Sequence, residues 1–396
     1  MARTAPRRTL ALAIVWASLV PCVSQAHSPD AELEHGLSNV IQAIEKDRPD
    51  VALQQVDALI TEHPTFRLAH LIRGDLLLSR TRPLEKFGDV AKADEHEKIE
   101  GLREEALARL RALRARPTTD RVPRDVLQLS PEQKFAIVVD SQLSRLYLFK
   151  NVNGYPQYVE DYYVTLGKRG MEKTREGDQR TPIGVYHVVA SLPRNKLTDF
   201  YGAGAFPINY PNSWDKLMGH DGHGIWLHGT PSNMYSRPPR ASDGCIVLAN
   251  PDLESIGRRV QIGLTPVIIV DEIHWSSTAA VDAERKALVR AIDAWRSDWE
   301  SRDVARYLSH YSKRFRANGQ DYAVWAARKR KINTAKSWVK IGISDLAMFR
   351  YPHERELAVV SFDQNYRSNN LSNVIRKVQY WSIENGSWKV LYEGAG

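Results

Sequence analysis

The residues best suited to chemistry in this chain lie between Gly224 and Leu248. The stretch reads G-I-W-L-H-G-T…A-S-D-G-C-I-V-L and contains His228 and Cys245. A thiol becomes an effective nucleophile when a nearby imidazole accepts its proton, so this pair could perform covalent acyl transfer. A histidine and a cysteine in one stretch are only weak evidence for an enzyme, so the residues around them must be considered as well.

The immediate neighbours of Cys245 favour a reactive thiol over a buried structural cysteine. Ser242-Asp243-Gly244 precedes it, and a glycine allows a tight turn that other residues cannot adopt. The backbone N–H groups of Gly244 and Cys245 are candidates for an oxyanion hole. Ser242 is a candidate for orienting the site, with a simple turn hydroxyl as the alternative, and Gly229 is expected to leave room for substrate beside His228.

The first residues predict export. Three arginines among the first eight residues precede an apolar run over residues 10–20 and the small residues Ser24-Gln25-Ala26. This is the layout of a secretory signal peptide, predicted over residues 1–26. The apolar run is shorter than the roughly 20 residues of a membrane span, although a retained anchor is an alternative. Cleavage would remove Cys22 and leave Cys245 without a partner for an internal disulfide.

Composition limits the partners. The chain has 396 residues and a formal net charge of +8, enough length for two or three domains after export. A mildly basic exported protein is compatible with an anionic polymer of the cell envelope. No basic stripe with interleaved aromatic residues is present, so we expect no nucleic acid partner.

Apolar spacing divides the chain into parts. Residues 27–116 read as a helical module, because Leu33, Leu37, Val40, Ile41 and Ile44 share one helical face. Further helices are expected over 50–61, 64–79 and 95–116. The run A-L-Q-Q-V-D-A-L-I-T-E-H-P-T-F resembles part of a tetratricopeptide repeat, without a clear second copy. The polar, proline-bearing residues 117–132 are predicted to be a linker.

Short β-rich runs follow. Residues 133–273 contain candidate strands over 135–139, 145–149, 158–166, 185–190 and 266–270, which indicate an antiparallel sheet or sandwich. Residues 280–396 begin with an amphipathic helix and continue with strands over 338–343, 357–362, 375–383 and 388–392. Helices followed by antiparallel strands predict an α+β domain.

Four motifs in order resemble the YkuD-type L,D-transpeptidase family. The family motif is His-Gly followed by Ser/Thr-x-Gly-Cys, which His228-Gly229 and Ser242-Asp243-Gly244-Cys245 match. Thr181-Pro182-Ile183-Gly184-Val185-Tyr186 resembles the family's Thr-Pro-x-Gly-x-Tyr/Phe entry. Residues 137–149 and 164–167 resemble its opening strands. The family often has histidine at the position of Asp243 and arginine at that of Val247, and the second departure removes a basic group near the site.

The resemblance implies a mechanism and a substrate. Cys245 would attack the carbonyl of an L-to-D peptide bond in a peptidoglycan stem, and His228 would accept the thiol proton. His223, Thr230 and Tyr201 are our candidates for substrate binding. No cofactor or metal is expected, although His220, His223, His228 and Cys245 admit a zinc alternative. The location expected is the periplasm or cell envelope.

The C-terminal residues resemble the cone-shaped nuclear-transport-factor-two-like fold, through F-x-Q-x-Y at Phe362–Tyr366 and the W…G-x-W-K pattern ending at Lys389. Its pocket could hold a glycan or an envelope protein. Trp299, Tyr307, Tyr311 and Phe315, read as helical, are expected to be core. The two-domain arrangement also resembles cell-shape L,D-carboxypeptidases. Three functions stay open: an L,D-transpeptidase, an L,D-carboxypeptidase with the same nucleophile, and an envelope-binding module without catalysis.

Overall fold

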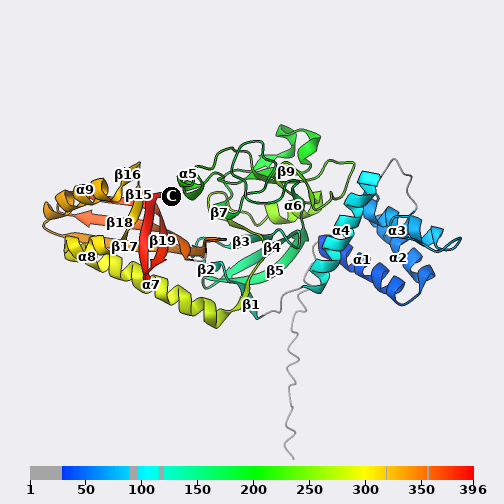
Figure 1. The fold of residues 1–396 in the computed structure, drawn as a ribbon, viewed down its shortest axis with the longest axis horizontal. Helices are drawn as coiled ribbons and strands as arrows, with labels where there is room; N and C mark the ends of the chain where they lie inside the picture. Colours follow the sequence, from blue (N-terminus) through cyan, green and yellow to red (C-terminus); the bar gives the residue numbers. More distant parts are fainter. Residues whose placement is uncertain (1–28, 90–95, 116–119, 318, 355) are drawn as a thin grey trace, which may run out of the picture.

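Three parts lie in a row along the longest axis of the computed structural model (Figure 1). It describes residues 29–89, 96–115, 120–317, 319–354 and 356–396, so the signal peptide predicted over residues 1–26 lies outside the described residues and stays a prediction. A helical module, a β-rich central domain and an α+β C-terminal domain follow one another, which confirms the predicted fold class. No helix of the described ranges is long and apolar enough to cross a membrane.

Helices form the N-terminal module, as the apolar spacing predicted. They are α1 (Pro29–Glu45), α2 (Pro49–Glu62), α3 (Arg67–Leu78) and α4 (His96–Arg114). Leu33, Leu37 and Val40 are buried in its core, whereas Ile44 is exposed. Tyr235 and Ala249 of the central domain belong to the same core. The module is therefore packed onto the central domain rather than tethered to it.

The segment predicted as a linker is tied to both neighbouring domains. It contains β1 (Arg121–Pro123), which pairs with β14 (Trp275–Ser277), and β2 (Val126–Gln128), which is an edge strand of the C-terminal sheet. Val126 and Leu127 are fully buried. Strands this short leave no alternating pattern in a polar, proline-bearing sequence, which is why the sequence indicated a linker but not these strand pairings.

Two main sheets build the central domain. The five-stranded sheet has the order β5-β4-β3-β13-β7, and its strands are β3 (Phe135–Asp140), β4 (Arg145–Val152), β5 (Tyr155–Tyr163), β7 (Gly184–His187) and β13 (Pro266–Val270). The four-stranded sheet has the order β12-β10-β9-β8, with β8 (Leu192–Pro193), β9 (Gly204–Pro207), β10 (Trp226–His228) and β12 (Ile246–Val247). A small pair joins β6 (Leu166–Gly167) to β11 (Arg240–Ser242). The strand positions agree with the prediction, but the sheets are mixed, because β3 with β13 and β10 with β12 run parallel.

The five-stranded sheet is covered on both faces. Ile137 and Val139 of β3 point into the central core, whereas Ala136 and Val138 point into a second core shared with the C-terminal domain. A strand buried on both faces reads as a continuous apolar run, as β3 does. The ring of Trp214, on the short helix α5 (Ser213–Leu217), stacks on Tyr380 of the C-terminal sheet with centroids 5.1 Å apart. The two domains therefore share packed apolar surface.

A seven-stranded sheet and three helices form the C-terminal domain. The helices are α7 (Thr278–Ser301), α8 (Val304–Ser309) and α9 (Tyr322–Thr334). The sheet order is β16-β15-β20-β19-β18-β17-β2, with β15 (Tyr311–Ala317), β16 (Gln320–Asp321), β17 (Val339–Arg350), β18 (Leu357–Ser368), β19 (Ser372–Glu384) and β20 (Ser387–Ala395). Figure 1 shows α7 running along the sheet.

The aromatic residues between Trp299 and Phe315 belong to the core, as expected, but not to one helix. Trp299 lies on α7, Tyr307 on α8, and Tyr311 and Phe315 on β15, and all four are buried. Arg302 ends α7 with φ of +62°, a left-handed conformation that helical spacing alone did not indicate.

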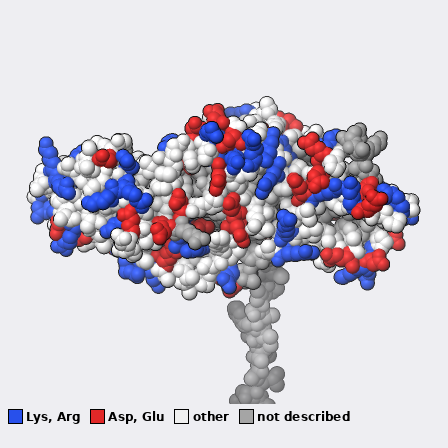
Figure 2. All heavy atoms as spheres, viewed as in Figure 1, with Lys and Arg blue, Asp and Glu red and all other residues white. Residues whose placement is uncertain are grey.

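Charged side chains of both signs are interspersed along the face of the molecule drawn in Figure 2. The net positive charge of the chain is therefore not gathered into one continuous basic band on this face.

Candidate active site

Two parallel strands bring His228 and Cys245 to one face. In the pairing of β10 with β12, Leu227 lies opposite Ile246 and His228 opposite Val247. Leu227 and Ile246 are fully buried in the central core. Side chains alternate along strands, so His228 and Cys245, each one residue away from these core positions, lie on the opposite face. The apolar core therefore sets His228, at the end of β10, and Cys245, immediately before β12, on the same face.

The imidazole of His228 is held in one tautomer. Its Nδ1 lies 2.7 Å from the carbonyl oxygen of Gly229. A carbonyl can only accept, so Nδ1 carries the hydrogen and Nε2 keeps its lone pair. Burial lowers the pKa of His228 to about 4, against the hydrogen bond to Gly229, and Arg237 lowers it further. At neutral pH the ring is therefore an uncharged base.

The thiol of Cys245 is free and partly buried. Its Sγ lies 3.4 Å from the carbonyl oxygen of Gly224, to which the thiol donates. Burial raises the pKa of Cys245 and Asp243 adds to this, while the backbone N–H of Trp226 and the charges of Lys173 and Arg237 oppose it. The sulfur is therefore protonated at neutral pH, and attack requires a base.

The turn before Cys245 is fixed by Ser242. The Ser242 hydroxyl accepts from the Gly244 N–H at 3.1 Å and donates to the Cys245 carbonyl at 2.6 Å. Gly244 has φ of +120°, and a Cβ there would lie 2.6 Å from the Arg180 carbonyl oxygen. Because the Gly244 N–H is used inside the turn, the Cys245 N–H is the better of the two candidates for an oxyanion donor.

A buried threonine holds this turn from the other side. Thr181 Oγ1 accepts from the Gly167 N–H at 2.9 Å and donates to the Gly244 carbonyl at 3.0 Å. Thr181 is fully buried, so both backbone groups depend on it for a partner. The Thr-Pro motif thus has a physical role, which is to lock the backbone that presents the sulfur.

Comparison with known proteins identifies two domain families in the chain. Residues 134–269 match the profile of the L,D-transpeptidase catalytic domain, YkuD, and residues 287–394 match the Cds6 C-terminal NTF2-like domain. The chain carries a YkuD-type L,D-transpeptidase domain. No curated protein sequence matches the chain at a significant level.

Two solved structures resemble the chain over more than either domain alone. Bd1075 of Bdellovibrio bacteriovorus is 27% identical, with a TM-score of 0.62 over 70% of this chain and 98% of its own. Pgp2, the helical cell shape determining protein of Campylobacter jejuni, is 26% identical, with a TM-score of 0.59 over 68% of this chain and 95% of its own. The pairing of an L,D-transpeptidase domain with an NTF2-like domain agrees with the resemblance seen in the sequence.

The role expected for Gly229 in the L,D-transpeptidase domain is corrected. A Cβ at Gly229 would lie 2.1 Å from Asn250 Oδ1, so its missing side chain admits Asn250 rather than substrate. The Asn250 side chain accepts from the Ala203 N–H and donates to the Thr230 carbonyl, each at 2.8 Å. Gly229 therefore lets Asn250 approach the backbone beside His228 and connect residues 203 and 230.

The three candidates for substrate binding have different surroundings. Tyr201 lies next to His228, which together with Cys245 we call the dyad, and the centroids of the Tyr201 and His228 rings are 5.1 Å apart. Thr230 is 1% exposed and donates to the Tyr235 carbonyl, so it supports the loop and does not face a substrate. The His223 side chain is 79% exposed and lies 3.6 Å from a carboxylate oxygen of Glu176. His223 directly precedes Gly224, whose carbonyl accepts the hydrogen bond from the Cys245 thiol.

The histidines of the zinc alternative do not converge. His220 Nδ1 lies 3.5 Å from Asp215, His223 pairs with Glu176, and His228 contacts its own strand. Within the part of the chain that the structure describes, no group of three or more His, Cys, Asp or Glu side chains is arranged to hold a metal ion.

Arg237, which was not among the predicted site residues, also lies near His228. Its guanidinium carbon lies 4.8 Å from the centroid of the Phe200 ring, and that ring lies 5.8 Å from the imidazole of His228. Its charge acts on both His228 and Cys245. The absence of arginine at Val247 suggested a site without a nearby basic group, whereas the loop over residues 231–240 supplies one.

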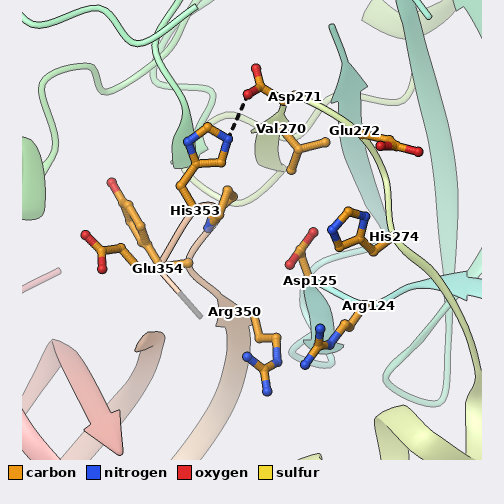
Figure 3. Close-up of a pocket in the computed structure, with 11 residues that line it drawn as sticks. Arg124, Asp125, Val270, Asp271, Glu272, His274, Arg350, His353 and Glu354 are labelled. Atoms are coloured by element: carbon orange, nitrogen blue, oxygen red, sulfur yellow. Dashed lines mark ion pairs between the residues drawn. The ribbon is translucent and has the colours of Figure 1, made fainter. Parts of the chain in front are cut away.

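A charged cavity of about 640 Å³ lies apart from the dyad, between the L,D-transpeptidase and C-terminal domains (Figure 3). Figure 3 shows Asp125 and His274 facing one another. Burial raises the pKa of Asp125 to about 6, against the charges of His274, Arg350 and Arg124. None of the residues that line it carries a thiol or an aliphatic hydroxyl: Arg124, Asp125, Val270, Asp271, Glu272, His274, Arg350, Tyr351, Pro352, His353 and Glu354. Without such a nucleophile, this cavity does not compete with Cys245 as a centre for acyl transfer.

Proposed function

We propose that this protein is a peptidoglycan-processing cysteine enzyme of the cell envelope, in which Cys245 is acylated by a stem peptide. The observation that carries the proposal is that the register of β10 and β12 sets a protonated thiol, just before β12, on the same face as the neutral imidazole of β10 in an L,D-transpeptidase domain. The cell-envelope location is supported by the family and by the likeness to a cell shape determining protein. The predicted signal peptide is consistent with it.

The first half of the reaction uses groups already in place. His228 Nε2 accepts the proton of the Cys245 thiol while the sulfur attacks the carbonyl carbon of an L-to-D peptide bond. The oxyanion lies within reach of the Cys245 N–H. When the C–N bond breaks, the imidazolium returns its proton to the departing amine of the D-residue. The product is a thioester between Cys245 and the shortened stem.

The second half decides the class of enzyme. An amine from another stem gives a cross-link and makes the protein an L,D-transpeptidase, which is the activity we favour from the family. Water gives a shortened stem and makes it an L,D-carboxypeptidase. The likeness to a cell shape determining protein over more than one domain favours this second candidate.

Product analysis separates these outcomes. Purified protein and a Cys245→Ala variant are incubated with disaccharide-tetrapeptide, and the products are identified by mass spectrometry. A cross-linked dimer with loss of D-alanine identifies a transpeptidase, and tripeptide alone identifies a carboxypeptidase. Unchanged substrate with the wild-type protein would contradict the proposed function and leave the envelope-binding module.

The C-terminal domain keeps its predicted partner, a glycan or an envelope protein, as a proposal. Inside it, Lys377 lies 3.1 Å from Glu393, and the Lys377 ammonium lies 5.4 Å from the ring centroid of Trp299. Lys377 and Trp299 are both buried, so this cluster belongs to the interior of the domain.

A further inference from the structure

The loop over residues 231–240, which borders the dyad, is anchored in the N-terminal helical module. The Tyr235 N–H donates to the Thr65 carbonyl at 3.2 Å, and the Tyr235 ring packs edge-on against Phe66 with centroids 5.7 Å apart. The Ser236 hydroxyl donates to Glu105 of α4 at 2.7 Å. Two consecutive loop residues therefore take their positions from helices that lie outside the L,D-transpeptidase domain.

A buried ion network sets the position of that module. Glu34 of α1 lies 2.6 Å from Arg109 of α4 and 2.7 Å from Arg145 of β4, which in turn lies 2.6 Å from Asp161 of β5. All four side chains are buried. Buried charges are stable only when each is paired, so this arrangement admits one docking position of the module. The loop is thereby fixed relative to β4 and β5.

Between these anchors, Arg237 is directed toward the dyad. Its backbone carbonyl accepts from Tyr163 at 2.9 Å and from Thr165 at 3.0 Å. Its guanidinium stacks on Phe200, whose ring in turn packs against His228. The guanidinium of Arg237 is therefore connected to the imidazole of His228 through the ring of Phe200.

Arg237 is half-buried and lacks an anionic partner. Among the residues that the structure describes, no carboxylate oxygen lies within 4.0 Å of its guanidinium. Asp243 acts on it from farther away and is itself paired with Lys168 at 2.9 Å. A guanidinium binds carboxylates with two parallel hydrogen bonds, and its partial desolvation strengthens such a contact.

We propose that Arg237 is the specificity-determining residue that binds a substrate carboxylate, and that the N-terminal module positions it. The inference rests on the proposed function, since a stem tetrapeptide ends in a free carboxylate beside the bond that Cys245 attacks. Arg237 would therefore select stems with a free terminus over stems whose terminus is blocked. Arg237 also supplies, from the loop over residues 231–240, a basic group in place of the arginine that the family often has at the position of Val247.

The test compares two substrates that differ at one group, a tetrapeptide stem ending in a carboxylate and the same stem ending in a carboxamide. A hydrogen bond to a charged group contributes about 1.5–3 kcal/mol, so wild-type protein should prefer the acid by about 10- to 100-fold in kcat/KM. Arg237→Gln should lose this preference through a higher KM for the acid, whereas the amide should show only the smaller change that follows from removing a charge near His228 and Cys245. Arg240→Gln is the matched control, because Arg240 is exposed on the same loop and should leave the preference intact.

A second variant tests the role of the module. Ser236→Ala removes the hydrogen bond to Glu105 and leaves Arg237 in place. It should reduce the preference for the acid by a few-fold without a comparable loss on the amide, while the thermal midpoint stays near that of the wild type.

The outcomes distinguish the two proposals. Cleavage of both substrates by wild-type protein without discrimination, or equal losses on acid and amide in Arg237→Gln, would overturn the role of Arg237 and leave the proposed function intact. Cleavage of neither substrate by wild-type protein would overturn both proposals.

Discussion

The carbonyl oxygen of Gly229 lies 2.7 Å from Nδ1 of His228, and this contact decides which nitrogen of the ring can act as a base. With Nδ1 donating to the carbonyl, Nε2 keeps its lone pair and, in the proposed mechanism, accepts the proton of the Cys245 thiol. A backbone carbonyl thus does the orienting that a carboxylate does in a Ser-His-Asp triad. The resting dyad is a neutral thiol beside a neutral imidazole.

This neutral pair predicts the pH dependence of Cys245. Burial raises the pKa of the thiol, so the rate of alkylation by iodoacetamide should increase continuously from pH 6 to pH 9 as thiolate forms. The rate is measured by mixing wild-type protein with excess iodoacetamide and following the loss of free thiol, with Cys245→Ala as the blank. A rate already on a plateau between pH 5 and pH 7 would indicate a preformed thiolate and imidazolium pair and would contradict the account.

The same ring predicts a pH dependence of stability. The pKa of His228 is about 4 in the folded protein and about 6.5 when unfolded, so the unfolded chain binds the proton more tightly. Stability from this group is fully present above pH 6.5 and is lost as the pH falls toward 4. At pH 5 the loss should be about 2 kcal/mol relative to pH 7.5. Urea unfolding at both values, with His228→Gln as the control, checks it, and equal losses in both proteins would refute the assignment.

Thr181 should support the turn through its hydroxyl alone. Thr181→Val keeps the shape but leaves the Gly167 N–H and the Gly244 carbonyl without partners in a buried place, at a cost of about 2 kcal/mol. Activity should fall with it, because the turn that carries Cys245 loosens. Thr181→Ser retains the hydroxyl and should retain most activity. Thermal unfolding and product formation measure both variants, and comparable losses in the two would contradict a role for the hydroxyl.

Gly244 should resist substitution for a steric reason as well as a conformational one. Its φ of +120° is unfavourable for other residues, and a Cβ would lie 2.6 Å from the Arg180 carbonyl oxygen. Gly244→Ala should therefore abolish measurable activity. Gly170→Ala is the control, because Gly170 has φ of +86° but open space around it. Activity assays compare Gly244→Ala with Gly170→Ala. Similar, modest losses of activity in the two variants would show that the close contact with Arg180 is unimportant.

The sequence revealed the parts of the site that depend on local pattern. His228, Cys245 and the Ser242-Asp243-Gly244 turn stand in one short stretch, and the strands around them have clear apolar runs. Tyr201, predicted to bind substrate, lies next to His228, and its role stays a prediction. Thr230 and Gly229 were misjudged, because their contacts with Tyr235 and Asn250 arise only when the chain folds back.

Long-range packing hid the remaining features. Arg237 was not singled out, since its position depends on contacts of its loop with Glu105 and Thr65, far away in sequence. The strands within the predicted linker were not expected, because β2 pairs with β17, which lies more than two hundred residues later in the chain. Neither relationship leaves a periodic signal in the chain.

The central claim is that Cys245 carries the acyl group of a stem peptide. Wild-type protein is mixed with disaccharide-tetrapeptide and quenched in acid within one turnover, and the intact mass and the peptide containing Cys245 are measured. We predict an adduct equal to the stem without its terminal D-residue, located on Cys245 and absent from Cys245→Ala. Full turnover by Cys245→Ala, or an adduct on another residue, would contradict the account.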